Sequence, residues 1–184
     1  MRVRALRSRP DAQPGVRRGH DVAVSRDARL QVAPGASLDL GDGCRIGERT
    51  RIVVAHGSVE IAAGAVLGER CTIVAHAGVS IGARAQLGHG TVIVDFDHVI
   101  ADVELPIRQQ GLESTPVAIG EDARIGFGAS VLRGVTVGAR AIIDPHAVVT
   151  RDVAAGGHVG GVPAKPLAGA PPGRGARAQV PDQT

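Results

Sequence analysis

The stretch VAIGEDARIGFGASVLRGVTVGARAIID, residues Val117–Asp144, carries an aliphatic residue at every sixth position. The same period runs along much of the chain, and the fifteen positions that follow it are all Leu, Ile or Val: Leu40, Ile46, Ile52, Ile61, Leu67, Ile73, Ile81, Leu87, Ile93, Ile119, Ile125, Val131, Val137, Ile143 and Val149. Glycine often comes next, and a small residue usually stands four places later. Such hexads are typical of a parallel β-helix, in which each hexad forms a short strand and a turn.

The hexads fall into triplets, because every insertion in the chain comes after the third aliphatic residue of a set. Glycine never follows that third residue; Val53, Val74, Val94, Leu132 and Thr150 stand there instead. We therefore predict an all-β triangular prism whose insertions all leave from one corner.

The prism is expected to cover residues 31–167, after an N-terminal cap at residues 1–30. Residues 168–184 contain no hexads and are rich in Pro, Gly and Ala, so we expect a disordered tail there.

Composition limits the function classes. The chain has 184 residues, a net charge of +3, two Phe and no Trp or Tyr, so its core must be aliphatic. Without aromatic residues to stack on bases, the basic charge does not favour nucleic-acid binding. No apolar run is typical of a signal peptide or a membrane span, so we expect a cytoplasmic protein. The two cysteines, Cys44 and Cys71, fall on different edges of the prism and should not form a disulfide.

One long interruption separates Ile93 from Ile119, a step of 26 residues. It opens with Asp95, Phe96, Asp97 and His98, and the inserted loop covers residues 98–116. Loops of this length in compact proteins are usually functional. Histidine can act as a base near neutral pH, and Asp95 and Asp97 could orient it or stabilise its charge. The alternative is a solvated loop histidine.

Several pieces in order, DFDH, PIRQQG, the hexads from Val117 onward, AVVTRDV and GGVPAKPL, resemble the hexapeptide-repeat acyltransferases. The resemblance covers about residues 40–167 and favours the branch of maltose, galactoside and polysaccharide O-acetyltransferases. It implies a left-handed β-helix, an exception to the usual right-handed crossover. It also implies a homotrimer with active sites between prisms, where His98 activates the hydroxyl or amine of a sugar-like acceptor for direct attack on acetyl-coenzyme A.

The same resemblance assigns the coenzyme A site. Gly126 and Phe127 would line the pantetheine arm, and Thr150, Arg151 and Lys165 would lie near the adenosine and its phosphates. No metal is expected.

The chain departs from the family pattern at two places. Arg124 stands where the family usually has tryptophan, and Pro145 stands where a small residue commonly donates its backbone N–H to coenzyme A. Proline has no N–H, so this bond cannot form.

Two other functions remain open. The first is a metalloenzyme resembling the γ-class carbonic anhydrases, because His56, His76 and His98 fall near one corner on successive coils. The second is a non-catalytic or degenerate trimer, which the two departures suggest.

Overall fold

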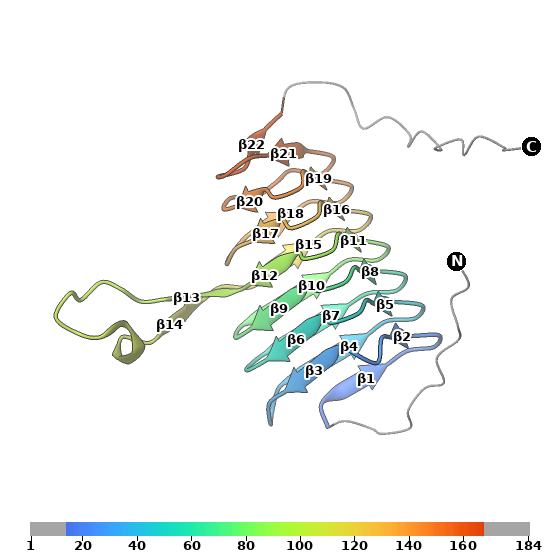
Figure 1. The fold of residues 1–184 in the computed structure, drawn as a ribbon, viewed down its shortest axis with the longest axis horizontal. Coiled ribbons are helices and arrows are strands. Elements are labelled where there is room, and N and C mark those ends of the chain that lie inside the picture. Colours follow the sequence, from blue (N-terminus) through green and yellow to red (C-terminus); the bar gives the residue numbers. More distant parts are fainter. Residues whose placement is uncertain (1–13, 168–184) are drawn as a thin grey trace, which may run out of the picture.

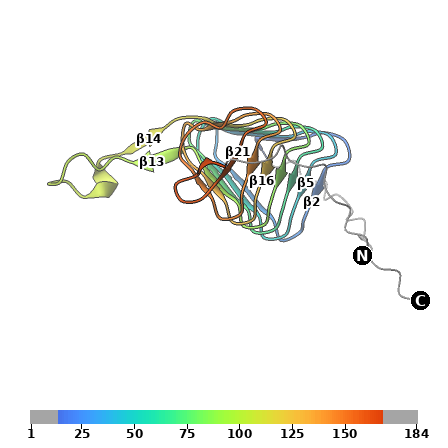
Figure 2. The same cartoon turned by 90° about the horizontal axis from the view of Figure 1, so that it is seen from above.

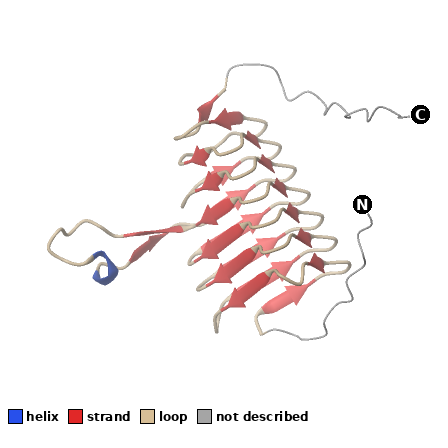
Figure 3. Ribbon diagram, in the orientation of Figure 1, coloured by secondary structure: helices blue, strands red, loops and turns tan. Residues whose placement is uncertain are grey.

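A computed structural model of the chain describes residues 14–167, and these residues form a triangular β-solenoid (Figures 1 and 2). Residues 1–13 of the predicted N-terminal cap (residues 1–30) and the predicted tail at residues 168–184 lie outside the described residues. Strands from successive coils pair in parallel along three faces, and the second face ends in one antiparallel pair (Figure 3).

Each face is one sheet. The first face contains β1 (Val16–Arg18), β4 (Ser37–Leu40), β7 (Ser58–Ile61), β10 (Gly78–Ile81), β15 (Val117–Ile119) and β18 (Thr136–Val137). The second contains β2 (Ala23–Val24), β5 (Arg45–Ile46), β8 (Val66–Leu67), β11 (Gln86–Leu87), β16 (Arg124–Ile125), β19 (Ile142–Ile143), β21 (His158–Gly160) and β22 (Lys165–Pro166). The third contains β3 (Arg29–Val32), β6 (Arg51–Val54), β9 (Thr72–Ala75), β12 (Val92–Val94), β17 (Ser130–Val131) and β20 (Val148–Val149).

The hexad prediction is confirmed by the core. All fifteen aliphatic positions are buried, with at most 3% of each side chain exposed. Small residues such as Ala65 and Ala129 fill the inward positions of the turns and are fully buried. Cys44 and Cys71 are buried as well and remain free thiols, as predicted. Each coil therefore buries its apolar side chains against its neighbours, which is how a solenoid is stabilised.

The solenoid begins earlier than residue 31, where the sequence reasoning placed its start. Strands β1, β2 and β3 form a first coil that pairs in register with the second coil, for example Val16 with Leu38 and Leu30 with Ile52. The hexad pattern is weak here because this coil covers the open end of the stack, and Leu30 and Val32 are only partly buried.

The turn between the second and third faces, called the second corner, repeats one geometry in successive coils. In the turn Asp144–Ala147, the N–H of Ala147 donates to the carbonyl of Asp144 at 3.2 Å, and His146 has a φ of 59°. A positive φ at the third residue is the mark of a type II turn. Arg49 and Arg70 occupy the same turn position in earlier coils, with φ values of 57° and 56°.

The predicted interruption is a β-hairpin, called the arm, at residues 96–114. Strands β13 (Phe96–His98) and β14 (Leu112–Ser114) pair antiparallel, and the 3-10 helix η1 (Ile107–Gln109) lies near the tip. The arm projects away from the prism at the corner between the third and first faces, called the arm corner (Figure 1). Among residues 14–167, no helix is both long enough and apolar enough to span a bilayer.

Candidate active site

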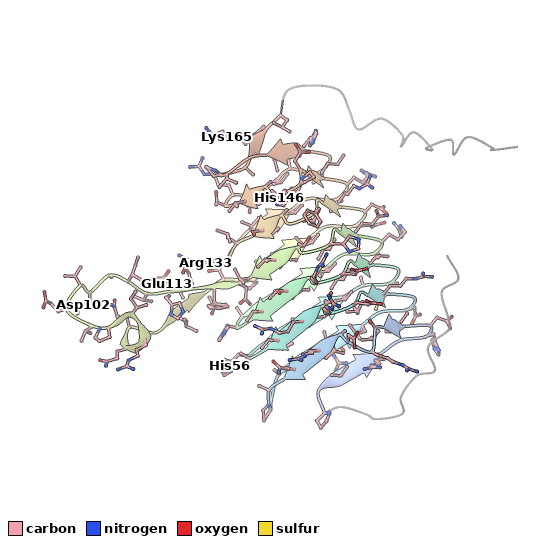
Figure 4. All side chains as sticks on the ribbon, in the orientation of Figure 1. His56, Asp102, Glu113, Arg133, His146 and Lys165 are labelled. Atoms are coloured by element: carbon pink, nitrogen blue, oxygen red, sulfur yellow. The ribbon has the colours of Figure 1, made fainter. Side chains whose placement is uncertain are left out.

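The arm is fixed to the prism at its root. The backbone N–H of Thr115 donates to the carbonyl of Asp95 at 2.8 Å, and Gly134 donates in turn to the carbonyl of Thr115 at 3.0 Å. The guanidinium of Arg133 lies 2.9 Å from the carboxylate of Glu113 on β14 (Figure 4). These contacts hold the start of the arm in one place, so a side chain on β13 has a defined position relative to the coils.

His98 is the last residue of β13 and is exposed. Its backbone pairs with Leu112 across the hairpin, and its ring lies edge-on to Phe96 with centroids 6.3 Å apart. Within residues 14–167, neither ring nitrogen makes a hydrogen bond or an ion pair. Both nitrogens are therefore accessible to a substrate.

Asp95 is fully buried, and its carboxylate accepts hydrogen bonds from the backbone of the preceding coil. One oxygen accepts from the N–H of His76 at 2.8 Å, and the other accepts from Ala77 at 2.7 Å and Gly78 at 2.6 Å. The sequence predicts a direct orienting role beside His98, but no hydrogen bond joins the two side chains. Asp95 instead anchors the root of the arm that carries His98.

Asp97 is exposed, and its carboxylate accepts from the backbone N–H of His98 at 2.8 Å. This contact fixes the local backbone at His98. It does not involve the His98 ring, so the charge-stabilising role predicted for Asp97 stays a prediction.

The aromatic column at the arm corner differs from the predicted stack of three histidines. The ring centroids of His56 and His76 are 5.8 Å apart, and Phe96 follows His76 at 4.5 Å. Phe96 thus takes the third place, and His98 lies beyond it. No group of three or more metal-ligating side chains forms within the part of the chain that the structure describes. A zinc site of the γ-class type would need ligands from another subunit.

Gly126 and Phe127 lie in the second corner, as the hexads predict. A Cβ atom at Gly126 would lie 2.4 Å from the nitrogen of Pro145, so close coil stacking alone requires glycine here. Phe127 is 48% exposed, and its ring packs edge-on against that of His146 with centroids 5.1 Å apart. Phe127 therefore offers an apolar surface at the outside of this corner.

Pro145 fits its turn. It occupies the second residue of the type II turn Asp144–Ala147, a position that proline favours. The equivalent N–H of Glu69 donates to Nδ1 of His89 at 3.0 Å, but those of His89 and Phe127 have no acceptor within residues 14–167. Proline at this turn position therefore removes no backbone-to-backbone bond between coils. The fold therefore tolerates Pro145, and the substitution changes only what this corner can donate to a ligand.

Thr150, Arg151 and Lys165 are exposed at the C-terminal end of the prism. The N–H of Ala164 donates to the carbonyl of Val148 at 2.8 Å, which places Lys165 near the start of β20. Neither Arg151 nor Lys165 forms an ion pair among the described residues. Two unpaired cations and a hydroxyl at one end of the prism suit a phosphate-bearing ligand.

The structure also contains a histidine–aspartate pair, His158 and Asp144, that the sequence analysis did not predict. The Nε2 atom of His158 lies 2.7 Å from the carboxylate of Asp144, and both side chains are partly buried. The one available signal is Asp144 itself, which replaces the glycine that follows the aliphatic residue at this position in other coils.

Comparison with known proteins identifies the repeat. The family model described as "Bacterial transferase hexapeptide (six repeats)" matches residues 116–151, and "Hexapeptide repeat of succinyl-transferase" matches residues 57–94. A protein named probable acetyltransferase from Mycobacterium tuberculosis is 36% identical over 114 residues, which are 62% of this chain and 38% of that protein. A 2,3,4,5-tetrahydropyridine-2,6-dicarboxylate N-acetyltransferase from Staphylococcus aureus is 50% identical over 52 residues, which are 28% of this chain and 22% of that protein.

Solved structures share the fold. The N-acyltransferase AntD from Bacillus cereus, in complex with dTDP and 3-hydroxybutyryl-CoA, has a TM-score of 0.71 and 15% identity, covering 81% of this chain and 80% of AntD. A hexapeptide-repeat acetyltransferase from Vibrio cholerae, complexed with acetyl coenzyme A, has a TM-score of 0.54 and 23% identity, covering 81% of this chain and 70% of that one.

The fold and the repeat together define a left-handed β-helix built from hexapeptide repeats. The chain contains hexapeptide repeats, and its resemblance to the hexapeptide-repeat acyltransferases is confirmed. None of the relatives named above is a maltose, galactoside or polysaccharide O-acetyltransferase, so that branch stays a prediction. The chain spans well under half the length of the two curated relatives named above.

Proposed function

We propose that this protein is a coenzyme A-dependent acyltransferase that acetylates a hydroxyl or amine of a sugar-like acceptor. Its relatives named above are acetyltransferases, and structures of the same fold hold coenzyme A or its thioesters. The observation that carries the proposal is the position of His98, an exposed imidazole without a partner in residues 14–167, on an arm whose root is fixed to the prism.

The reaction needs only a base and orientation. His98 accepts the proton of the acceptor hydroxyl or amine as its oxygen or nitrogen attacks the thioester carbonyl carbon. The tetrahedral intermediate then collapses, the C–S bond breaks, and the coenzyme A sulfur leaves with a proton. A positioned general base contributes about 10²–10⁴-fold to the rate. The thioester is already activated, so no nucleophilic Ser or Cys is needed.

The donor site is proposed to extend from the second corner across the third face to the residues that follow β20. Phe127 would pack against the pantetheine arm beside Gly126, and Thr150, Arg151 and Lys165 would hold the adenosine and its phosphates. The exposed ring of Phe127 and the unpaired cations Arg151 and Lys165 support this assignment. Acetyl-coenzyme A is the proposed donor.

The functional unit is proposed to be a homotrimer. Five large apolar side chains on the arm are exposed in the single chain, by 41% to 91% of their surface: Ile100, Val103, Leu105, Ile107 and Leu112. Exposed apolar clusters of this kind mark interaction sites. A neighbouring prism that covers the arm would also complete the environment of His98.

The acceptor class is proposed to be a saccharide. AntD has been solved with dTDP-4-amino-4,6-dideoxyglucose and coenzyme A, and it shares the fold of this chain. An amine of an amino sugar is therefore as suitable as a sugar hydroxyl. We propose that the protein acts in the cytoplasm, where acetyl-coenzyme A is made, and that neither nucleic acid nor membrane takes part in its reaction.

The test begins with a thermal-shift titration of the purified protein with coenzyme A and acetyl-coenzyme A. Binding to the native state should raise the melting temperature in a saturable way. Acyl transfer to amino sugars and sugars is then compared in the wild type, His98→Ala and the exposed control His20→Ala. We expect at least a 100-fold loss of kcat in His98→Ala alone. If coenzyme A produces no shift at millimolar concentration, the proposal fails, and a non-catalytic solenoid or a metal site takes its place.

A further inference from the structure

Four arginines gather in a hollow of about 600 Å³ at the second corner of the first two coils. The hollow is lined by Arg26, Asp27, Ala28, Arg29, Arg49 and Arg51. Its volume lies in the range of small-molecule sites, about 300–1,000 Å³.

The register of the coils brings the arginines together. Arg29 on β3 and Arg51 on β6 are direct neighbours in parallel strands, which places their backbones about 4.8 Å apart. Arg26 and Arg49 come from the turns that precede these two strands. On the next two coils Thr72 and Val92 occupy the position of Arg51, so the strand arginines are confined to the first two coils, and only Arg70 continues the row at the turn.

The positive charge is not balanced within the described residues. None of the four arginines lies within 4.0 Å of a carboxylate in an ion pair, and Asp27 is the one acidic residue of the lining. Other arginines do have such partners, since Arg17 pairs with Asp39 and Arg133 with Glu113. Glu48, which precedes Arg49, forms no ion pair with the cluster.

Like charges on directly paired strands destabilise a sheet. Arg29 and Arg51 therefore repel each other unless an anion lies between them. A guanidinium presents a planar fork of donors that matches phosphate oxygens, and several forks around one hollow suit a ligand with more than one phosphate.

We propose that this cluster is a binding site for the diphosphate group of a small molecule. It is separate from the proposed donor site, because Arg49 lies three coils before Phe127 on the same corner, about 14 Å along the prism. The diphosphate could belong to a nucleoside diphosphate or to coenzyme A itself, and the experiment distinguishes these sources. The proposal does not depend on acyl transfer.

The test measures binding of pyrophosphate and dTDP to the full-length protein by calorimetry at about 50 mM and 200 mM salt. We expect saturable binding that weakens with salt, as ion pairing with phosphate requires. The double variant Arg29→Gln/Arg51→Gln should bind at least tenfold more weakly. The matched control Arg124→Gln/Arg140→Gln removes the same charge from two exposed arginines elsewhere and should bind as the wild type does.

A competition experiment between pyrophosphate and coenzyme A identifies which molecule supplies the diphosphate group. Displacement of pyrophosphate by coenzyme A would assign the diphosphate to coenzyme A, whereas independent binding of both would assign it to a nucleotide. Circular dichroism and the melting temperature show whether Arg29→Gln/Arg51→Gln folds, and the single variant Arg51→Gln serves if it does not. Absence of saturable binding at low salt, an equal loss in the control, or binding of single-stranded RNA without pyrophosphate binding would overturn the proposal.

Discussion

At the scale of single residues, Asp95 explains why the arm leaves the prism where it does. It occupies an inward position at the end of the third face, where Val54 and Ala75 lie in the two preceding coils. Its carboxylate compensates for burial by accepting three backbone hydrogen bonds from residues 76–78. The same residue therefore closes one coil and begins the arm.

Replacing the Asp95 carboxylate should lower the stability of the fold. In Asp95→Ala, three backbone N–H groups lose a charged acceptor, and we expect unfolding to become easier by about 3 kcal/mol. The exposed control Asp97→Ala should change stability by less than about 0.5 kcal/mol. Urea unfolding of both variants checks this. Equal stability of Asp95→Ala and the wild type would show that the buried hydrogen bonds are not important.

The buried thiols should be inert in the native state. Burial is the main cause that raises the pKa of Cys44 to about 11, and it raises the pKa of Cys71 as well. Because the folded pKa of Cys44 lies above its unfolded value near 9, its contribution to stability is complete below about pH 9 and is lost as pH approaches 11. In Cys71→Ala, we expect negligible reaction with a disulfide reagent at pH 8 until urea unfolds the chain. Rapid labelling of the native protein would contradict this placement.

At the scale of elements, the type II turns of the second corner determine which residues can face a ligand. Pro145 fits its turn but lacks the N–H that the resemblance assigns to coenzyme A binding. The neighbouring coil keeps this N–H at Phe127, where no acceptor occurs within residues 14–167. The family pattern is therefore altered in one coil of the corner and retained in the next.

Pro145→Ala separates stability from ligand binding. Alanine restores the N–H and gives the unfolded chain more freedom, so stability should fall by about 0.4–1 kcal/mol. Coenzyme A should bind a few-fold more tightly, because one hydrogen bond contributes about 0.5–1.5 kcal/mol. Melting temperature and calorimetric titration measure the two effects. Unchanged binding in the variant would place coenzyme A away from this turn, and weaker binding would contradict the expected hydrogen bond.

At the scale of the whole molecule, stability comes from coils that stack closely enough for backbones to touch at the corners. A Cβ atom at Gly120 would lie 2.4 Å from the nitrogen of Ala139 in the next coil. Gly78 differs, since its nearest neighbour would be the carbonyl oxygen of Ser58 at 3.6 Å. Neither glycine has a positive φ, so the comparison isolates the spacing between coils.

The added methyl group in Gly120→Ala should therefore push the coil that contains Gly120 away from the coil that contains Ala139. We expect a loss of about 1–3 kcal/mol, the usual range for overpacking, against little change in Gly78→Ala. Thermal unfolding of the two variants tests this directly, and a similar melting temperature for both would mean that the coils can move apart without cost.

The sequence alone determined the architecture, because an inward aliphatic residue at every sixth position specifies strand, turn and face together. The sequence also placed all the insertions at one corner and identified His98, at the start of the longest insertion, as the candidate base. Tertiary structure decided the relations between coils. Phe96 rather than His98 continues the histidine column, Asp95 turns inward, and Arg29 and Arg51 become neighbours. These relations depend on the register between coils and on the antiparallel pairing of the arm, which no local pattern in the sequence encodes.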